Sequence, residues 1–400
     1  MVDYDLLFAI IFFGLILIII LKNKDKFIIQ NKIIAIYKTQ LGIKLMDKIA
    51  KKFPRILNIL SYISITIGFI GMILILFLLT KGTLELLFVP DAPPPIAPVF
   101  PKVTIPGLPP LSFWHWIISI FIVALVHEFS HGIFARLYNL KVKSAGIAFI
   151  GPILAAFVEP DENQLKKTSK KKQLAIISAG PFSNFIFFII FLLIAIFVMN
   201  PINDKIFDQN GIVVNEIVEN YPISKTDLKI PFTIVKVNEI ETLTMADFKS
   251  AFENIKPNDN VIITTSTGES ITVKAVENPN DKTKGYIGIG KFTPAIKNTL
   301  TKFRFLGNIT IWLSLLIFWL YTINIGVGLF NLFPLGPIDG GRMFSIFTLW
   351  IFKDNDQKAM KLCNFMSLFC LLLLFINLLP WLGKLITFLF KPILFLIALI

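Results

Sequence analysis

Long apolar runs constrain this chain more than any other feature of its sequence. A helix needs about 20 apolar residues to cross the roughly 30 Å hydrocarbon core of a bilayer, and several runs approach that length, among them DLLFAIIFFGLILIIIL at residues 5–21. Of the 400 residues, 55% are hydrophobic, 16% are charged and 40 are phenylalanine, which is more apolar surface than one soluble core buries. The sequence therefore predicts a polytopic α-helical membrane protein with about six to seven spans.

Clusters of lysine and arginine predict which loops face the cytoplasm. Ten such residues lie between Lys22 and Arg55 against two aspartates, and residues 139–172 contain seven lysines against three acids. By the positive-inside rule both segments are cytoplasmic, so we expect a multi-pass protein of the plasma membrane with its N-terminus outside. The lysines flank apolar spans instead of forming a groove, so the net charge of +13 does not indicate a nucleic-acid partner.

Residues 201–300 differ from the rest of the chain. Their acidic and basic residues are nearly balanced, and strand-like runs such as FTIVKVNEI and NVIITTS alternate with helix-like stretches such as MADFKSAFENI. Alternation of this kind is typical of a soluble domain with both helices and strands. We therefore predict an extracytoplasmic α+β domain here, inserted between membrane spans.

Two histidines and a glutamate interrupt the apolar segment VALVHEFSHGIF at residues 123–134. On a helix, His127 and His131 are four residues apart and project from one face, so both imidazoles can reach one metal ion. Glu128 lies beside them as a candidate general base. The alternative is a set of polar residues that face a helix bundle, but in an apolar span each of them then needs another partner. The pattern predicts a metal site.

A catalytic zinc usually has three protein ligands and one open position, so a third ligand is needed. His115 is roughly 18 Å along the helix from His127, and we interpret it as an interfacial anchor. Asp339, in NLFPLGPIDGG, is the favoured ligand, because its prolines and glycines break helical geometry at a comparable depth in the membrane. The alternative for Asp339 is a turn-forming Asp-Gly pair. Three carboxylates downstream of the histidines are rival ligands: Glu159, Asp161 and Glu162.

Three motifs occur in a defined order along the chain. HEFSH is followed by SAGPFSNF, which contains Gly180, Pro181 and Asn184, and then by NLFPLGPIDGG. Together they resemble the helical H-E-x-x-H, the G-P-x-x-N and the aspartate-bearing elements of the site-2 protease family of intramembrane zinc metalloproteases. The resemblance covers roughly residues 113–345.

The resemblance implies one zinc ion per chain, held by His127, His131 and Asp339, with Glu128 activating the attacking water. It also implies that Asn184 hydrogen-bonds the substrate carbonyl or the developing oxyanion; the alternative is an ordinary amide at a helix start. In this family the stretch after the histidines forms a β element at membrane level, here residues 146–160, which can pair with an unwound substrate.

The external domain resembles a protease-type PDZ domain. It departs from that pattern at Ile230, Pro231 and Phe232, where such domains usually have Gly-Asp, which argues against binding of a peptide carboxylate and leaves a gating or size-filter role. The alternative is a folded extracytoplasmic insert without peptide affinity. The predicted organisation has five parts: 1–112, two leading spans with a basic loop and a proline-rich external segment; 113–200 and 301–345, the two halves of the protease core; 201–300, the PDZ-like domain; and 346–400, the C-terminal membrane helices.

The resemblance implies a zinc metalloendopeptidase that cleaves membrane-spanning protein substrates within or beside their transmembrane segments, near the cytoplasmic side. Two alternatives belong to other classes. A metal or ion transporter would predict inverted repeats, which the dissimilar motifs do not form. A proteolytically inactive, PDZ-bearing membrane scaffold would be favoured by loss of Glu128 or of a ligand, and all of these residues are present.

Overall fold

The computed structural model describes residues 4–30, 34–90, 92–101, 103, 105, 107–150, 153–279, 281–298 and 304–397. The chain divides into two compact units: Met1–Ala195 with Leu315–Ile400, and Ile196–Ser314. Within the described residues, six helices are long and apolar enough to cross a membrane: Asp5–Lys22, Pro54–Phe88, Phe113–Leu137, Lys170–Ile206, Phe305–Asn331 and Asp356–Gly383. They confirm that the chain is a polytopic helical membrane protein.

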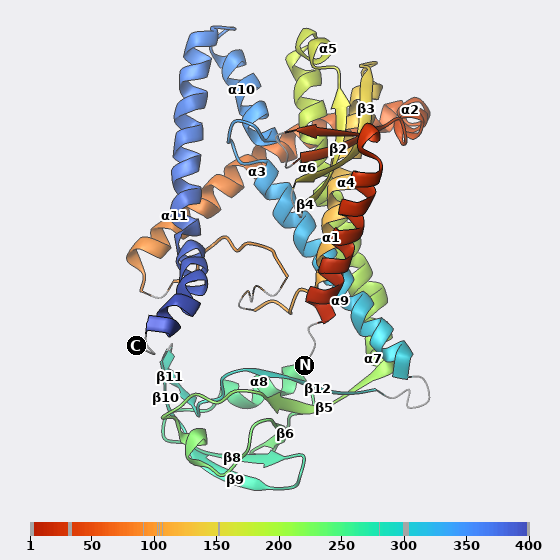
Figure 1. Ribbon diagram of the computed structural model, residues 1–400. Helices are drawn as coiled ribbons and strands as arrows, with labels where there is room; N and C mark the ends of the chain where they lie inside the picture. The colour runs from red at the N-terminus through yellow and green to blue at the C-terminus, as the bar shows by residue number, and fades with distance from the viewer. Residues whose placement is uncertain are drawn as a thin grey trace. The chain divides into compact units, whose positions relative to one another are not determined.

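The first unit is built around long helices (Figure 1). Its helices are α1 (Tyr4–Lys22), α2 (Ile43–Lys52), α3 (Pro54–Phe88), α4 (Phe113–Leu137), α5 (Glu162–Lys167), α6 (Lys170–Ile194), α10 (Asp339–Ile351) and α11 (Asp356–Ile397), with a short 3-10 helix, η1 (Lys24–Lys26). The helix α9 (Arg304–Asn331) begins in the second unit and continues into the first from Leu315. The helix α4 packs against α6, and α6 also packs against α3 and α10. In this way α4 and α10, which carry the predicted ligands, contact one shared neighbour.

The apolar run at about 362–379 predicts the last span, and residues 385–400, with Lys391 and Pro392, are too short to predict a further crossing. The structure has one continuous helix instead, α11, from Asp356 to Ile397. Lys391 and Pro392 do not end it. The apolar run at about 57–80 predicts the second span, and the helix there is longer than that run, because α3 extends from Pro54 to Phe88.

A four-stranded antiparallel sheet accompanies these helices. Its strands are β1 (Phe27–Gln30), β2 (Ile34–Thr39), β3 (Val142–Ile150) and β4 (Ile153–Pro160), in the spatial order β1-β2-β3-β4. The hairpin of β3 and β4 agrees with the β element expected at residues 146–160. The strands β1 and β2 come from the basic loop before α3 and were not predicted. As the last strand of the sheet, β4 has an edge that no described strand covers.

The second unit contains mainly strands. A sheet with the order β12-β5-β6-β8-β9 is formed by β5 (Phe207–Val214), β6 (Phe232–Val237), β8 (Asn260–Thr265), β9 (Ser270–Lys274) and β12 (Phe292–Asn298), and β7 (Ile240–Glu241) pairs with β6. The strands β10 (Val276–Asn278) and β11 (Asp281–Tyr286) form a hairpin. Its helical elements are η2 (Ala195–Met199), a π-helix, α7 (Asn200–Ile206), the 3-10 helix η3 (Pro222–Lys225) and α8 (Met245–Glu253).

The core of the second unit lies between its sheet and α8. Ile212, Ile234, Val261 and Ile263 are fully buried there, from strands β5, β6 and β8. Thr244 begins α8 with a capping box, in which its side chain and that of Asp247 each accept from the other residue's backbone N–H, and such boxes fix a helix start. The predicted α+β character of this region is confirmed; its assignment as a PDZ domain stays a prediction.

Candidate metal centre

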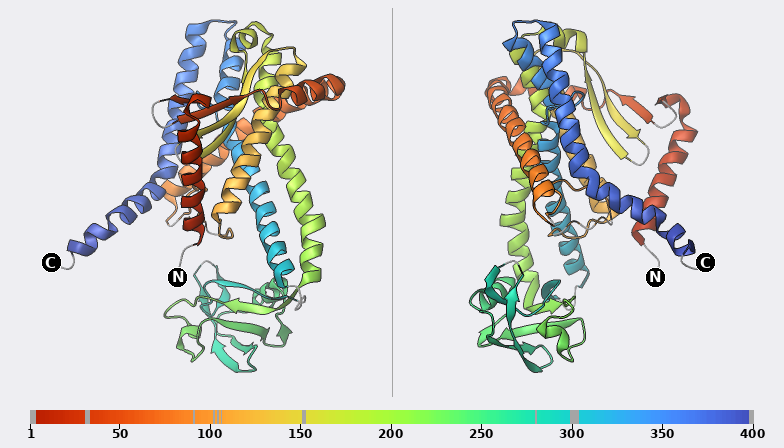
Figure 2. Two further views of the ribbon diagram at one scale, coloured as in Figure 1. Left: turned by 45° about the vertical axis from the view of Figure 1, so that its right-hand side comes forward. Right: turned by 90° about the vertical axis from the view of Figure 1, so that its left-hand side faces the viewer.

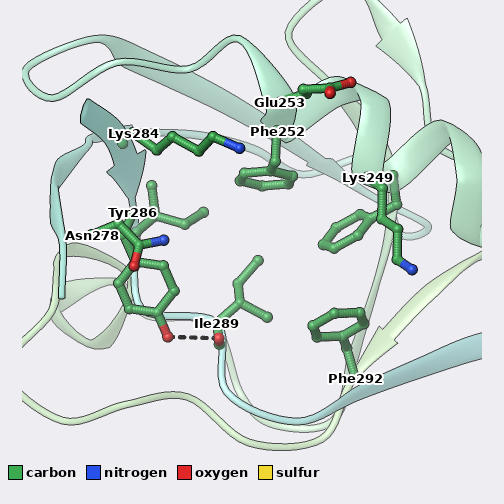
Figure 3. A pocket seen from close by; sticks show the side chains of 11 residues that line it. Lys249, Phe252, Glu253, Asn278, Lys284, Tyr286, Ile289 and Phe292 are labelled. Carbon is green, nitrogen blue, oxygen red and sulfur yellow. Dashed lines mark hydrogen bonds between the residues drawn. The ribbon is translucent and has the colours of Figure 1, made fainter. Parts of the chain in front are cut away.

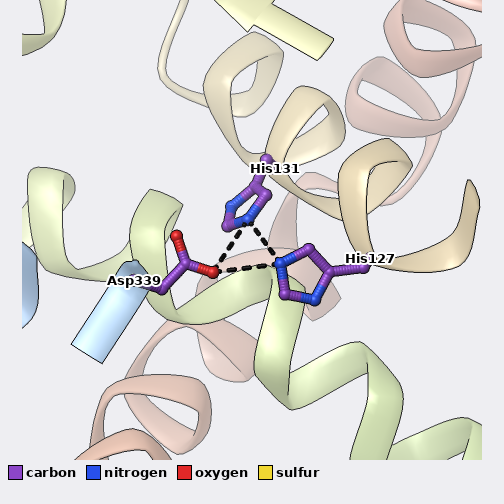
Figure 4. A group of neighbouring side chains, drawn as sticks. All are labelled: His127, His131 and Asp339. Carbon is purple, nitrogen blue, oxygen red and sulfur yellow. Dashed lines mark hydrogen bonds and ion pairs between the residues drawn. The ribbon is translucent and has the colours of Figure 1, made fainter. Parts of the chain in front are cut away.

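The three predicted ligands converge in the first unit (Figure 4). Nε2 of His127 lies 3.0 Å from Oδ2 of Asp339, and Nε2 of His131 lies 3.3 Å from the same oxygen. The two Nε2 atoms are 3.2 Å apart. One ligand atom from each residue falls within a group that spans at most 4.8 Å. Tetrahedral zinc with bonds of about 2.0–2.1 Å separates its ligand atoms by about 3.3 Å, so the donor set and its spacing fit one zinc ion.

The segment NLFPLGPIDGG brings Asp339 to this position. The helix α9 ends at Asn331, because Pro334 and Pro337 cannot continue it, and α10 begins at Asp339 itself. The backbone then turns back closely on the preceding loop: a Cβ on Gly340 would collide with the carbonyl of Leu332. Glycine is therefore required beside the aspartate for the turn that aims its carboxylate at α4.

Gly180, in the middle of α6, lies directly against the imidazole rings. A Cβ at this position would lie 2.6 Å from Nε2 of His127 and would also collide with Nε2 of His131. Contacts below 3.0 Å are not tolerated without displacement of one partner. The glycine of the G-P-x-x-N element thus leaves room for both ligand rings, a reason that the sequence pattern alone does not provide.

The second nitrogen of each histidine is also held. Nδ1 of His131 is 2.7 Å from the carbonyl oxygen of Ile176 in α6, so this nitrogen carries the proton and donates it. That tautomer leaves the Nε2 lone pair directed at the cluster. A metal-binding histidine commonly donates its other N–H to a carbonyl or carboxylate in this way, which fixes the ring orientation.

Asn184 contacts the second ring nitrogen of His127, as the carbonyl of Ile176 does for His131. Its side chain is fully buried, with Nδ2 3.1 Å from Nδ1 of His127 and with Oδ1 lacking a hydrogen-bond partner among the described residues. Amide oxygen and nitrogen are assigned from the hydrogen-bond network. With the amide turned over, Oδ1 accepts from Nδ1–H, which satisfies the buried oxygen and leaves Nε2 free for metal. The structure therefore brings Asn184 against His127, while its expected role toward the substrate stays a prediction.

A cavity of about 260 Å³ adjoins the cluster and is lined by both histidines, Asp339, Val158 and Arg342 among others. Glu128 also lines this cavity. Its Oε2 accepts a hydrogen bond of 3.0 Å from the backbone N–H of Val158 in β4. The carboxylate is outside the group of three ligand atoms. It is therefore placed beside the cluster, as a base must be, and is oriented by the edge strand of the sheet.

The three rival carboxylates have other partners. Glu159 pairs with Lys38 at 2.7 Å and accepts from Ser144; the hydrogen bond from Lys38, and after it that from Ser144, holds the pKa of Glu159 below its ordinary value. Asp161 caps α5 by accepting from the backbone N–H groups of the next turn. Glu162 pairs with Arg342 at 2.8 Å. None of the three belongs to the ligand cluster.

His115, at the start of α4, does not take part in the cluster either. It lies in the first turn, where its Nδ1 is 2.5 Å from the hydroxyl of Ser112, the residue that caps the helix. The side chain is buried rather than exposed. Its position at one end of α4 agrees with the separation from His127 that the sequence predicted.

The second unit contains a separate apolar pocket of about 400 Å³ (Figure 3). It is lined by Phe248 and Phe252 of α8 together with Ile289 and Phe292, and the hydroxyl of Tyr286 donates to the carbonyl of Ile289 at 2.8 Å. The sequence predicted no site here, because these residues read as ordinary core positions. The lining combines these apolar side chains with polar ones from Lys249, Glu253, Asn278 and Lys284.

Two histidines and an aspartate converge between apolar helices, with a glutamate beside them. This arrangement is typical of membrane metallopeptidases that use zinc. The model of peptidase family M50 matches residues 115–375, which include the whole cluster. A relative, an uncharacterized protein of Methanocaldococcus jannaschii, is 30% identical over 344 residues, 84% of each chain. The chain therefore belongs to peptidase family M50, and it is a membrane metallopeptidase of the site-2 protease type.

Proposed function

We propose that this protein hydrolyses a peptide bond within or beside the transmembrane segment of membrane-tethered proteins, near the cytoplasmic side, using one zinc ion per chain. One observation carries the proposal: His127, His131 and Asp339 converge to within 4.8 Å on a cavity that Glu128 also lines. Two helices long enough to span a membrane are connected to this cluster: α4 contains both histidines, and α9 ends at Asn331, shortly before Asp339.

The residues divide the chemistry between them. A zinc ion held by the two imidazoles and the carboxylate would lower the pKa of a water molecule and polarise the scissile carbonyl. Glu128 accepts the proton of the attacking water and passes it to the nitrogen of the leaving amine. Asn184 and Ile176 keep the two imidazoles in the tautomer that directs Nε2 toward the cluster.

The edge of β4 supports a way of presenting the substrate. A peptide bond in a helix is shielded by its own hydrogen bonds, so the substrate must unwind before water can reach it. Strand addition supplies new backbone partners to an unwound segment, and β4 ends the described sheet next to Glu128. An extended substrate strand along β4 would therefore lie beside the catalytic cavity.

The location of the cluster supports cleavage near the cytoplasmic side. His127 and His131 lie in the C-terminal half of α4, and Asp339 follows the C-terminal end of α9. The lysine-rich segments that connect spans, 22–55 and 139–172, belong to the same side by the positive-inside rule. On this topology the N-terminus and residues 201–300 are external, where the PDZ-like domain acts as a size filter for substrates.

The test is cleavage of tagged single-span proteins in proteoliposomes by wild type and by Glu128→Gln. The substitution leaves all three ligands in place, so we expect unchanged zinc content and loss of cleavage, and a zinc chelator should block the wild type. Glu216→Gln, which changes an exposed carboxylate paired with Lys291, is the matched control and should cleave normally. Equal cleavage by wild type and Glu128→Gln would refute the proposed role of Glu128.

A further inference from the structure

The short helix α2 connects two membrane spans without being one. It lies between the end of α1 at Lys22 and the start of α3 at Pro54. In the left-hand view of Figure 2 it runs across the direction of the long helices rather than along them. A helix that connects the end of one apolar span to the start of the next, and that runs across them, is expected at the level of the lipid headgroups.

The inner face of α2 packs on the helix that carries the histidines. Met46 and Ala50 are buried, and a Cβ on Gly132, the residue after His131, would lie 2.5 Å from Sδ of Met46. Asp47 forms an ion pair with Arg136 of α4. The metal-binding turn of α4 therefore rests on α2, so a displacement of α2 displaces the backbone next to a ligand.

The outer face of α2 and its two ends combine long cations with large exposed apolar side chains. Leu41 is 78% exposed, Leu45 51% and Phe53 41%. The exposed cations are Lys44, Lys48, Lys51, Lys52 and Arg55. Between residues 41 and 56 the sole acid is Asp47, and its carboxylate is engaged by Arg136, so the lysines of this segment have no free carboxylate within the segment itself.

We propose that this face of α2 binds the anionic headgroup layer of the leaflet, and that the contact holds the metal-binding turn of α4 in its active position. Lysine-rich amphipathic helices with exposed Leu and Phe bind anionic membrane surfaces, because the cations pair with headgroups while the apolar side chains enter the acyl boundary. An acidic protein would match the lysines alone. The apolar side chains among them favour lipid, and the flanking spans keep α2 at its surface. The link to cleavage rests on the proposed function.

The experiment reports on α2 directly as well as on cleavage. The environment-sensitive fluorophore NBD is attached to Leu45→Cys in a chain with Cys363→Ala and Cys370→Ala, and the purified protein is placed in vesicles of phosphatidylcholine with increasing phosphatidylglycerol. We expect the emission to shift to the blue as the anionic fraction rises. Cleavage of a single-span substrate by the wild type should rise severalfold over the same series.

Two sets of variants separate this surface from general charge effects. Changing Lys44, Lys48, Lys51 and Lys52 to Gln should abolish both responses while zinc content is retained. Changing four exposed lysines of the second unit, Lys225, Lys229, Lys274 and Lys282, to Gln should leave both responses intact.

Equal emission in neutral and anionic vesicles, or a shift that persists in the α2 variant, would overturn the lipid contact. A shift without any change in cleavage rate would overturn its link to α4. Absence of cleavage in every lipid, with the shift intact, would count against the proposed protease function and leave the lipid contact standing.

Discussion

At the scale of single residues, Asn184 is the side chain whose role can be tested most sharply, because it is fully buried and lies against His127. Helical spacing pointed to His127 and His131 and loop composition to Asp339, but neither pointed to this contact. The contact between Asn184 and His127 joins residues that are 57 positions apart in the sequence. At such a separation the spacing of residues does not predict which side chains meet. The family resemblance assigned Asn184 to the substrate, whereas the structure shows it against a ligand ring.

Replacing Asn184 by Leu distinguishes these two roles. If Asn184 orients His127, Asn184→Leu should weaken zinc affinity by about 10- to 100-fold, as loss of such supporting hydrogen bonds usually does. Zinc retention against a competing chelator measures this directly. Ser183→Ala, which removes a neighbouring hydroxyl that contacts backbone carbonyls, is the control and should keep its zinc. Wild-type zinc affinity combined with a lower kcat would instead favour the oxyanion role.

Gly180 allows a steric test of the same cluster. Gly180→Ala adds a single methyl group against both imidazoles, so we expect loss of bound zinc and of cleavage while the helices remain folded. The matched control is Gly326→Ala in α9, where an added Cβ meets nothing within 4 Å. Circular dichroism reports the helices, and metal analysis reports the zinc. Full zinc occupancy in Gly180→Ala would show that the rings have more space than the structure gives them.

At the scale of elements, the β hairpin after the histidines was expected and the structure of the basic loop was not. The family resemblance implied a β element at residues 146–160, and β3 and β4 confirm it. The loop between α1 and α3 was interpreted only through its lysines, so β1, β2 and α2 were missed. Two runs in it, FIIQ and IIAIYKT, flank a polar turn, and that is a hairpin signal.

The ion pair between Lys38 and Glu159 ties β2 to the hairpin of β3 and β4, and it predicts a pH dependence. Since the pKa of Glu159 is lowered in the folded protein, the pair stabilises the fold above the ordinary pKa of the carboxyl, and this is lost as pH falls through the lowered pKa. Lys38→Met should therefore lower the free energy of unfolding at neutral pH by less than about 1 kcal/mol, because both groups are partly exposed. The change is measured as a small decrease in Tm. The difference from wild type should vanish in acid, whereas Lys24→Met in η1 should show none at any pH. A difference that persists at low pH would mean that Lys38 acts through packing.

At the scale of the whole molecule, the sequence predicts an inserted domain at residues 201–300, because hydropathy and charge balance there differ from those of the flanking spans. The structure has two compact units, and the second of them is Ile196–Ser314. Strand order in the second unit could not be predicted, since β12 pairs with β5 across more than 75 residues, and such pairings are determined by packing between distant segments.

That pairing also makes the size-filter role testable. Phe207 and Asn298 are directly paired at one end of the sheet, so residues 208–297 can be excised and the ends joined by a short Gly-Ser linker without stretching the flanking helices. The metal cluster lies entirely in the first unit, so the excised protein should retain zinc and should still cleave substrates already trimmed outside the membrane.

The substrate that tests the size filter is a single-span protein with a folded external domain next to its transmembrane segment. A filter predicts that the intact protein cleaves it poorly and that the excised protein cleaves it as well as the trimmed form. Glu128→Gln in the excised background must abolish all cleavage, which excludes a contaminating protease. If the excised protein retains zinc and cuts the trimmed substrate but still rejects the bulky one, selection by size resides in the membrane helices, and the second unit has another role.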